Sequence, residues 1–247
     1  MLGDEGHKEM VSNLRHLAET MPKPSAILVV SAHWEESQPT LTLGKTPPLY
    51  YDYYGFPQES YELEYPAPGD DSLVGKIQKA LKNSGIESRT ESERGYDHAL
   101  FIPLLLMYPE ANIPCVEMSL IKGLDPSAHI AVGKALSKLE DENILIIGSG
   151  FSFHNMRAFF APDTPETKAA NNDFDAWLRE TCSSQEIDES EREKRMIEWE
   201  AAPHARYCHP REEHLIPLHV CIGATGRACP EVFELEIIQK KASAFRW

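Results

Sequence analysis

Two runs of consecutive apolar residues constrain the fold of this chain more than any other feature. Residues 26–30 read Ala-Ile-Leu-Val-Val, and residues 144–148 read Ile-Leu-Ile-Ile-Gly. Each run has the length of a strand and is far shorter than the ~18 residues that a membrane-spanning helix needs. Strands that are apolar at every position are typical of parallel sheets covered by helices on both faces. The two runs therefore predict an α/β protein with a buried, mostly parallel sheet.

Helical and strand patterns alternate through the rest of the sequence. Helices are expected over residues 8–20, 72–84, 98–107, 126–139, 171–182 and 191–200. Further strands are expected over residues 86–89, 113–120 and 232–239. A last helix is expected to open at His209-Pro210, because proline suits the first helical turn. The alternation predicts one domain, residues 1–247, with a mixed, mostly parallel sheet flanked by helices on both faces.

Composition excludes several classes of protein. The chain has 24 Lys and Arg against 39 Asp and Glu, a formal net charge of −15, so phosphate backbones would repel it and nucleic acid is not an expected partner. No apolar run spans a membrane, and the first five residues lack the features of a signal peptide. The five cysteines contain no Cys-x-x-Cys pair, which argues against a disulfide scaffold or a zinc ribbon. We expect a cytoplasmic protein.

Four of the ten histidines stand at the ends of predicted elements. His33 follows the first apolar run, His154 follows the second, His98 opens a helix, and His214 lies just beyond the expected helix start at His209-Pro210. In open α/β sheets, ligands bind beyond the carboxyl ends of the strands. These four side chains are therefore expected to converge on a metal or a substrate, and neutral imidazole suits both iron and zinc.

Simpler interpretations also fit these residues. A lone histidine at a strand end is more often a capping or surface residue than a ligand, and no pair has the spacing of the H-E-x-x-H motif. Gly148-Ser149-Gly150 lacks both a phosphate-binding glycine pattern and the nucleophile elbow of serine hydrolases. Asp97 and Glu117 could pair with histidine, but we expect them to be capping or solvated residues.

Six sequence blocks, in order along the chain, carry a family resemblance. They are Ala26-Ile-Leu-Val-Val-Ser-Ala-His33-Trp34, Tyr51-Asp-Tyr-Tyr-Gly-Phe-Pro57, Tyr65-Pro-Ala-Pro-Gly69, Gly95-Tyr-Asp-His98, Gly148-Ser-Gly-Phe-Ser-Phe-His154-Asn155 and His209-Pro-Arg-Glu-Glu-His214. Together they resemble the class III extradiol ring-cleavage dioxygenases of the LigB type, and among these the 4,5-DOPA extradiol dioxygenase branch. The resemblance extends over about residues 1 to 240.

The resemblance implies a site with one non-haem divalent metal, Fe(II) in active enzymes or Zn(II) in some purified relatives. It implies that His33, His154 and His214 are metal ligands, with His154 alternatively the acid/base residue. It also implies catalytic roles for His98 and His154.

The resemblance further implies which residues lie against the substrate. Tyr53 belongs to a segment, residues 47–69, that holds six of the nine tyrosines and is expected to be a long loop. In the family this region lies near the aromatic substrate, and the resemblance therefore implies substrate-binding roles for Tyr53 and for His209.

The implied activity is opening of the ring of a catechol-type aromatic, such as DOPA, by dioxygen at the bond adjacent to the diol. Family members begin with a short strand ending in His-Gly, which supplies a metal ligand, and Met1-Leu2-Gly3-Asp4 aligns just after it. The alternative expectation is a catalytically impaired or non-enzymatic metal- or peptide-binding member of the same fold. A zinc hydrolase, acting without dioxygen, is a third.

Overall fold

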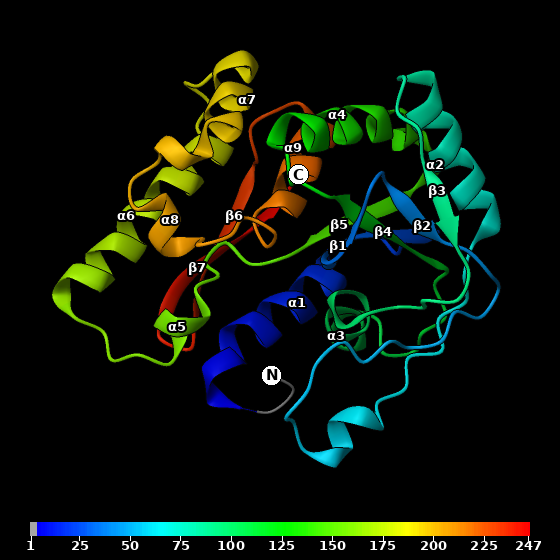
Figure 1. Cartoon of the computed structure of the whole chain (residues 1–247), viewed down its shortest axis with the longest axis horizontal. Coiled ribbons are helices and arrows are strands. Elements are labelled where there is room, and N and C mark those ends of the chain that lie inside the picture. Colours follow the sequence, from blue (N-terminus) through cyan, green and yellow to red (C-terminus); the bar gives the residue numbers. More distant parts are fainter. Residues whose placement is uncertain (1–3) are drawn as a thin grey trace.

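The computed structural model describes residues 4–247 and shows a five-stranded sheet between two layers of helices (Figure 1). The strands follow the order β3-β2-β4-β1-β5 across the sheet. Their bounds are β1 Ala26–Glu36, β2 Thr40–Thr42, β3 Arg89–Glu91, β4 Cys115–Ile121 and β5 Ile144–Ser149. β1 pairs in parallel with β4 and β5, and β2 pairs in parallel with β3 but antiparallel with β4. The predicted mixed, mostly parallel sheet is confirmed.

Helices pack against both faces of β1. These helices are α1 Lys8–Thr20, α2 Asp71–Asn83, α3 His98–Met107, α4 Pro126–Leu136 and α9 Ile216–Thr225. Leu28 and Val30 pack into one apolar core with α2, α4 and α9, whereas Ile27 and Val29 pack into a second core with α1 and α3. Because successive side chains of a strand point to opposite faces, a run that is apolar at every position can fill both cores.

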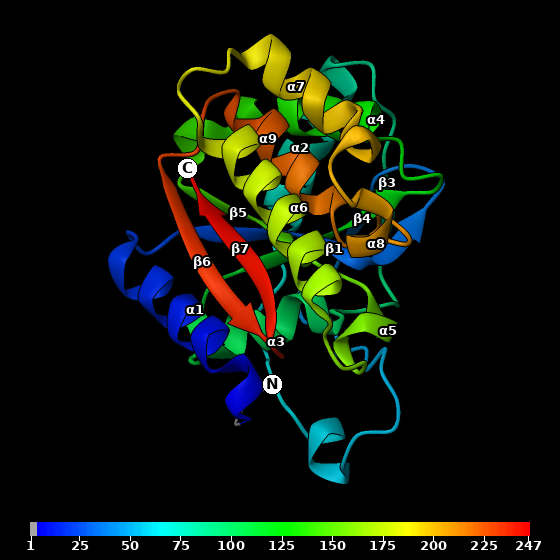
Figure 2. The same cartoon turned by 90° about the vertical axis from the view of Figure 1, so that its left-hand side faces the viewer.

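A third apolar core lies beside the sheet, under a separate group of helices. This group is α5 Met156–Phe159, α6 Pro165–Ser183, α7 Glu189–Ile197 and α8 Ala205–Cys208. Phe174 and Leu178 of α6 pack there against Trp199. Strands β6 Glu231–Ile237 and β7 Lys240–Arg246 form their own two-stranded antiparallel sheet, which runs between α1 and α6 (Figure 2).

Most predicted helices are confirmed, with ends that differ by a few residues, but several expectations are wrong. The helix expected at His209-Pro210 begins instead at Ile216, and the turn before it is held by the amide of Phe151, which donates to the carbonyl of His214 at 3.1 Å. The strand expected over residues 86–89 begins only at Arg89. The strand expected over residues 232–239 exists as β6 but lies outside the main sheet.

The burial of the second apolar run also differs from the expectation. β5 is the edge strand of the main sheet in the described part of the chain, and its residues are only partly buried. A cavity of about 770 Å³ lies along β5. Within residues 4–247, the helices are all too short or too polar to cross a bilayer. The alignment that concerns Met1–Gly3 falls outside the described residues.

The contact between α4 and α9 tests this architecture. A Cβ added at Gly133 of α4 would clash with the carbonyl oxygen of Val220, and one at Gly223 of α9 with that of Ile130. We expect Gly133→Ala to lower the free energy of unfolding by about 1–3 kcal/mol, because the close-packed helices would have to separate. The measurement is urea unfolding followed by circular dichroism.

Gly75 provides the matched control, since it lies within α2, is exposed, and has nothing within 4 Å of an added Cβ. Gly75→Ala is expected to raise the free energy of unfolding by about 0.5–1 kcal/mol, through helix propensity. Equal effects of the two substitutions would contradict the close α4–α9 contact.

Candidate metal centre

The four histidines expected to converge do so at the carboxyl ends of β1 and β5. The rings of His33 and His98 have centroids 4.0 Å apart, those of His33 and His214 lie 4.9 Å apart, and those of His154 and His214 stack at 3.3 Å. His33, His98 and His214 are among the residues that line the cavity along β5. The predicted convergence is thus confirmed, and it joins residues more than 180 positions apart in the sequence.

A break in the β1 ladder positions His33. The register of β1 against β4 shifts between Ser31 and Glu35, so the intervening residues leave the regular pairing. The hydroxyl of Ser31 accepts a hydrogen bond from the amide of His33 at 3.0 Å and donates to the carboxylate of Asp97 at 2.8 Å. A bulge of this kind re-aims a side chain next to a site.

Asp97 links this bulge to the start of α3. Its carboxylate accepts hydrogen bonds from the amide of Ala99 at 2.9 Å and from Arg94 at 2.8 Å, so the expected helix cap is confirmed. Glu117 on β4 accepts a hydrogen bond from the amide of Asp97 at 3.1 Å and is fully buried, so the expectation that it is solvated is wrong. Burial, together with the neighbouring Asp97, raises the pKa of Glu117.

A glycine permits the approach of His214 to the end of β5. A Cβ at Gly150 would clash with the carbonyl oxygen of His214, so only glycine allows the two segments to touch. Four residues further on, the amide of His154 donates to the carbonyl of Cys208 at 2.9 Å. The turn before α9 is therefore fixed against the loop after β5, and His154 and His214 are brought into contact.

Two carboxylates that sequence reasoning missed hold these rings in pairs. Oδ1 of Asp52 lies 2.7 Å from Nδ1 of His98, and its Oδ2 lies 3.4 Å from Nδ1 of His33. Oε1 of Glu213 lies 3.0 Å from Nδ1 of His214 and 3.2 Å from Nδ1 of His154. Each carboxylate thus faces the Nδ1 atoms of two histidines, and a proton on Nδ1 leaves the lone pair on Nε2.

Electrostatics favour the uncharged form of two of the four rings. Burial lowers the pKa of His33 to about 4, with help from the neighbouring His98 and His214, and burial also lowers the pKa of His214. Burial acts to raise the pKa values of Asp52 and Glu213, but hydrogen bonds from the histidines outweigh it and hold both below their usual range. Neutral imidazole beside ionised carboxylate is the form that coordinates a metal.

The donor atoms fit a divalent cation. Nε2 of His33 lies 3.3 Å from Nε2 of His214, so two nitrogens that both carry lone pairs face each other. Two groups of donors are found among the described residues, and within each group the donor atoms all lie within 4.8 Å of one another: His33, Asp52 and His98 form one group, and His154, Glu213 and His214 form the other. Buried Oδ2 of Asp52 and Oε2 of Glu213 have no hydrogen-bond partner among residues 4–247. A nitrogen and oxygen donor set of this kind suits Fe(II) or Zn(II).

Tyr53 and His209 occupy different positions relative to the cluster. The ring of Tyr53 meets that of His98 edge to face, with centroids 5.5 Å apart, and its hydroxyl donates to the carbonyl of Ser60. His209 is fully buried behind the cluster, beside Phe174, and its Nε2 donates to the carbonyl of Ser152 at 2.9 Å. The structure therefore brings Tyr53 to the site and places His209 beneath it.

Comparisons with known proteins agree on one family. The sequence model described as "Catalytic LigB subunit of aromatic ring-opening dioxygenase" matches residues 4–244. The chain is 37% identical over 244 residues to "Dioxygenase tasH" of Hapsidospora irregularis, covering 91% of this chain and 74% of that protein. It is 40% identical over 205 residues to "4,5-DOPA dioxygenase extradiol" of Beta vulgaris, covering 83% and 74%.

The fold is similar to that of a solved bacterial protein. The crystal structure of uncharacterized protein JW3007 from Escherichia coli K12 superposes with a TM-score of 0.71 at 26% sequence identity. The match covers 94% of this chain and 90% of that one.

The burial of His209 leads to a pH-dependent stability. Burial lowers the pKa of His209 to about 3, and its Nδ1 has no hydrogen-bond partner among the described residues. As the pH falls below about 6.5, the unfolded chain takes up a proton at this position that the folded chain does not, so the free energy of unfolding decreases by up to about 1.4 kcal/mol per pH unit.

His209→Gln retains an N–H group for Ser152 but cannot titrate. In metal-free protein, urea unfolding between about pH 6 and pH 4 should show a shallower dependence on pH for this variant than for the unsubstituted chain. Identical slopes would contradict the assignment of His209 as a buried neutral imidazole.

Proposed function

Because the chain belongs to the LigB family of aromatic ring-opening dioxygenases, we propose that it opens the ring of a catechol-type aromatic at the bond adjacent to the diol. The observation that supports this most is the cluster of four imidazoles, held in pairs by Asp52 and Glu213. Relatives named 4,5-DOPA dioxygenase extradiol support a DOPA-like substrate. One catechol and one dioxygen give one semialdehyde that contains both oxygen atoms, so no further reductant is consumed.

The proposed site holds one divalent metal, Fe(II) for activity or Zn(II), through His33, His154 and His214. The facing Nε2 atoms of His33 and His214 and the contact of His154 with His214 support this set. When bound, the metal would supply a Lewis acid and a common template for the diol and dioxygen.

His98 is the proposed base for the substrate. Asp52 contacts its Nδ1 at 2.7 Å and also accepts a hydrogen bond from its amide at 3.1 Å, so the ring orientation is fixed and the Nε2 lone pair is available. That nitrogen can accept the proton that a catechol hydroxyl releases on binding. His154, whose Nδ1 lies 3.2 Å from Glu213, is the proposed second acid/base residue.

Aromatic side chains next to His98 supply a surface for the substrate ring. Tyr53 packs against Tyr51, Phe56, Tyr61 and Phe101 as well as against His98. Edge-to-face contacts of this kind favour a further aromatic ring. We assign Tyr53 to substrate binding through its ring, and we propose that His209 acts indirectly, by supporting the segment beneath the cluster.

The function is tested by reconstitution. Metal-free protein is loaded with Fe(II) without oxygen and is then mixed with DOPA in air. The expected result is a yellow semialdehyde product, formed with the uptake of one dioxygen per ring opened. Stoichiometric metal binding with no oxygen uptake across a panel of catechols would instead support the metal- or peptide-binding alternative, and ester or amide hydrolysis without oxygen would support a zinc hydrolase.

Single substitutions separate the proposed roles. His33→Ala and His214→Ala should lower the metal content measured by elemental analysis, because each removes a ligand. His98→Ala should leave the metal in place and lower kcat by about 10²- to 10⁴-fold. His16→Ala, which changes an exposed histidine of α1, is the matched control and should alter neither quantity. Unchanged metal content in the first two variants would refute the ligand assignment.

A further inference from the structure

A second cavity, of about 670 Å³, adjoins the cluster at His154 and Glu213. Its other walls come from α5, from the beginning of α6, from Tyr207 and from residues 210 and 211. Its volume is in the range of sites that hold small organic ligands. His154 lines this cavity and its ring stacks on that of His214, so the cavity lies directly beside the cluster.

One cation of this cavity, an exposed arginine, has no ion-pair partner among residues 4–247. Asp163 is paired with Lys240, and Arg211 lies 2.7 Å from Glu35 and 3.6 Å from Glu213. Arg157, on α5, lines the same cavity and has neither an ion pair nor a hydrogen bond with any residue of the described part of the chain. In a chain of net charge −15, an uncompensated guanidinium on a cavity wall is available for an anionic ligand.

Hydrogen bonds of neighbouring residues fix the backbone segment that carries Arg157 beside the cluster. The side chain of Asn155 caps α5, accepting from the amide of Ala158 at 3.1 Å, and donates to the carbonyl of Tyr207 at 2.7 Å. The preceding residue, His154, is anchored through its own amide to Cys208. Three residues of chain span at most ~11 Å, so Arg157 and His154 lie on one fixed piece of backbone.

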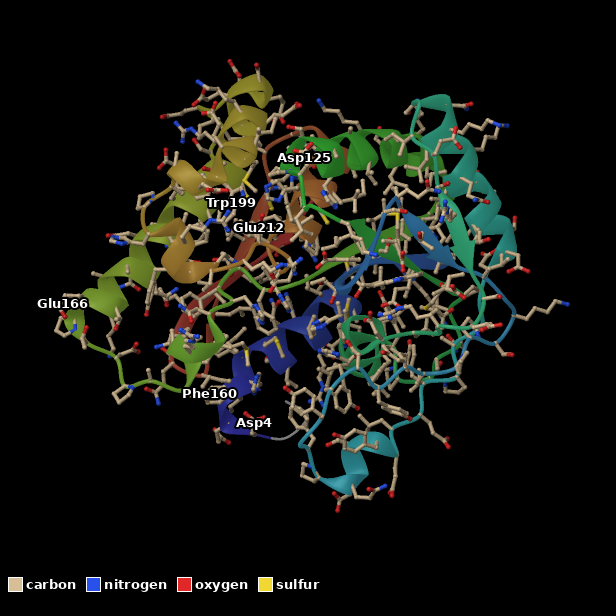
Figure 3. All side chains as sticks on the ribbon, in the orientation of Figure 1. Asp4, Asp125, Phe160, Glu166, Trp199 and Glu212 are labelled. Atoms are coloured by element: carbon tan, nitrogen blue, oxygen red, sulfur yellow. The ribbon has the colours of Figure 1, made fainter. Side chains whose placement is uncertain are left out.

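The cavity also carries apolar surface that is open to solvent. Met156 lines it and is 53% exposed. Phe160, the residue that follows α5, is not among the lining residues and is 77% exposed at the lower left of the molecule (Figure 3). An aliphatic linker between a catechol ring and a charged end group would pack here.

Resting on the proposed function, we infer that Arg157 binds the carboxylate at the end of the ring substituent of the substrate. The planar guanidinium can donate two parallel hydrogen bonds to a carboxylate and form an ion pair with it. A neutral substituent cannot form that ion pair. The chain therefore selects catechols with a carboxylate-bearing side chain over neutral catechols.

The test compares 3-(3,4-dihydroxyphenyl)propionate with its methyl ester, which keeps the shape and removes the charge. In the Fe(II)-loaded protein, Arg157→Gln should raise KM for the acid about 10- to 100-fold, the worth of a charged hydrogen bond, with little change in kcat. The kcat/KM for the ester should not change. Arg157→Lys should recover part of the loss, because it restores the charge without the planar fork.

Arg89→Gln is the matched control, since Arg89 is an exposed arginine of β3, at the opposite edge of the sheet from β5. It should change neither substrate's kinetics. If Arg157→Gln raises KM equally for the acid and for the ester, or changes neither KM, the inference is overturned while the proposed function stands.

A binding measurement separates the inference from the proposed function. Calorimetry on metal-free protein compares the acid and the ester without turnover. If the unsubstituted chain opens neither these compounds nor DOPA, the proposed function fails; binding of the acid that Arg157→Gln abolishes would still support the arginine's role, and equal binding by both chains would overturn it.

Discussion

The site depends on the polar contacts between two carboxylates and four imidazoles. Asp52 comes from the long loop after β2 and Glu213 from the turn before α9, so each ties a loop to an element end. Burial alone would raise the pKa values of both carboxyl groups, yet the histidine contacts keep them ionised. An ionised carboxylate at Nδ1 fixes the ring and its tautomer, and the Nε2 atoms become the reactive surface.

The scaffold holds these loops because the layers around the sheet approach one another very closely. Gly133 and Gly223 let α4 and α9 touch, and Gly150 lets the end of β5 meet His214. Below the cluster, Ser31, Asp97 and Glu117 form buried hydrogen bonds that join β1, α3 and β4. Protein interiors resist compression, so contacts made this tightly can hold side chains to within the tolerance that catalysis requires.

The sequence predicted the sheet and the convergence of the histidines for one physical reason. A strand that is apolar at every position requires cover on both faces, and the carboxyl ends of parallel strands lie at one edge. Asp52 carried no comparable signal, since it stands in an aperiodic, tyrosine-rich loop. Pro210 and Pro217 suit a helix start equally, and the helix begins at Ile216, after a turn in which the carbonyl of His214 accepts a hydrogen bond from the amide of Phe151. Likewise, the pattern of β6 does not specify its pairing partner.

Charge distribution connects the metal site to the choice of substrate. A net charge of −15 favours the approach of a divalent cation and opposes that of an anionic catechol. At physiological salt, however, fields from exposed charges decay within ~8 Å. In the proposed carboxylate site beside His154, the guanidinium of Arg157, unpaired among residues 4–247, therefore acts at short range, where distant surface carboxylates are screened. An acidic protein can in this way favour a divalent cation at its surface and still bind a carboxylate inside a cavity.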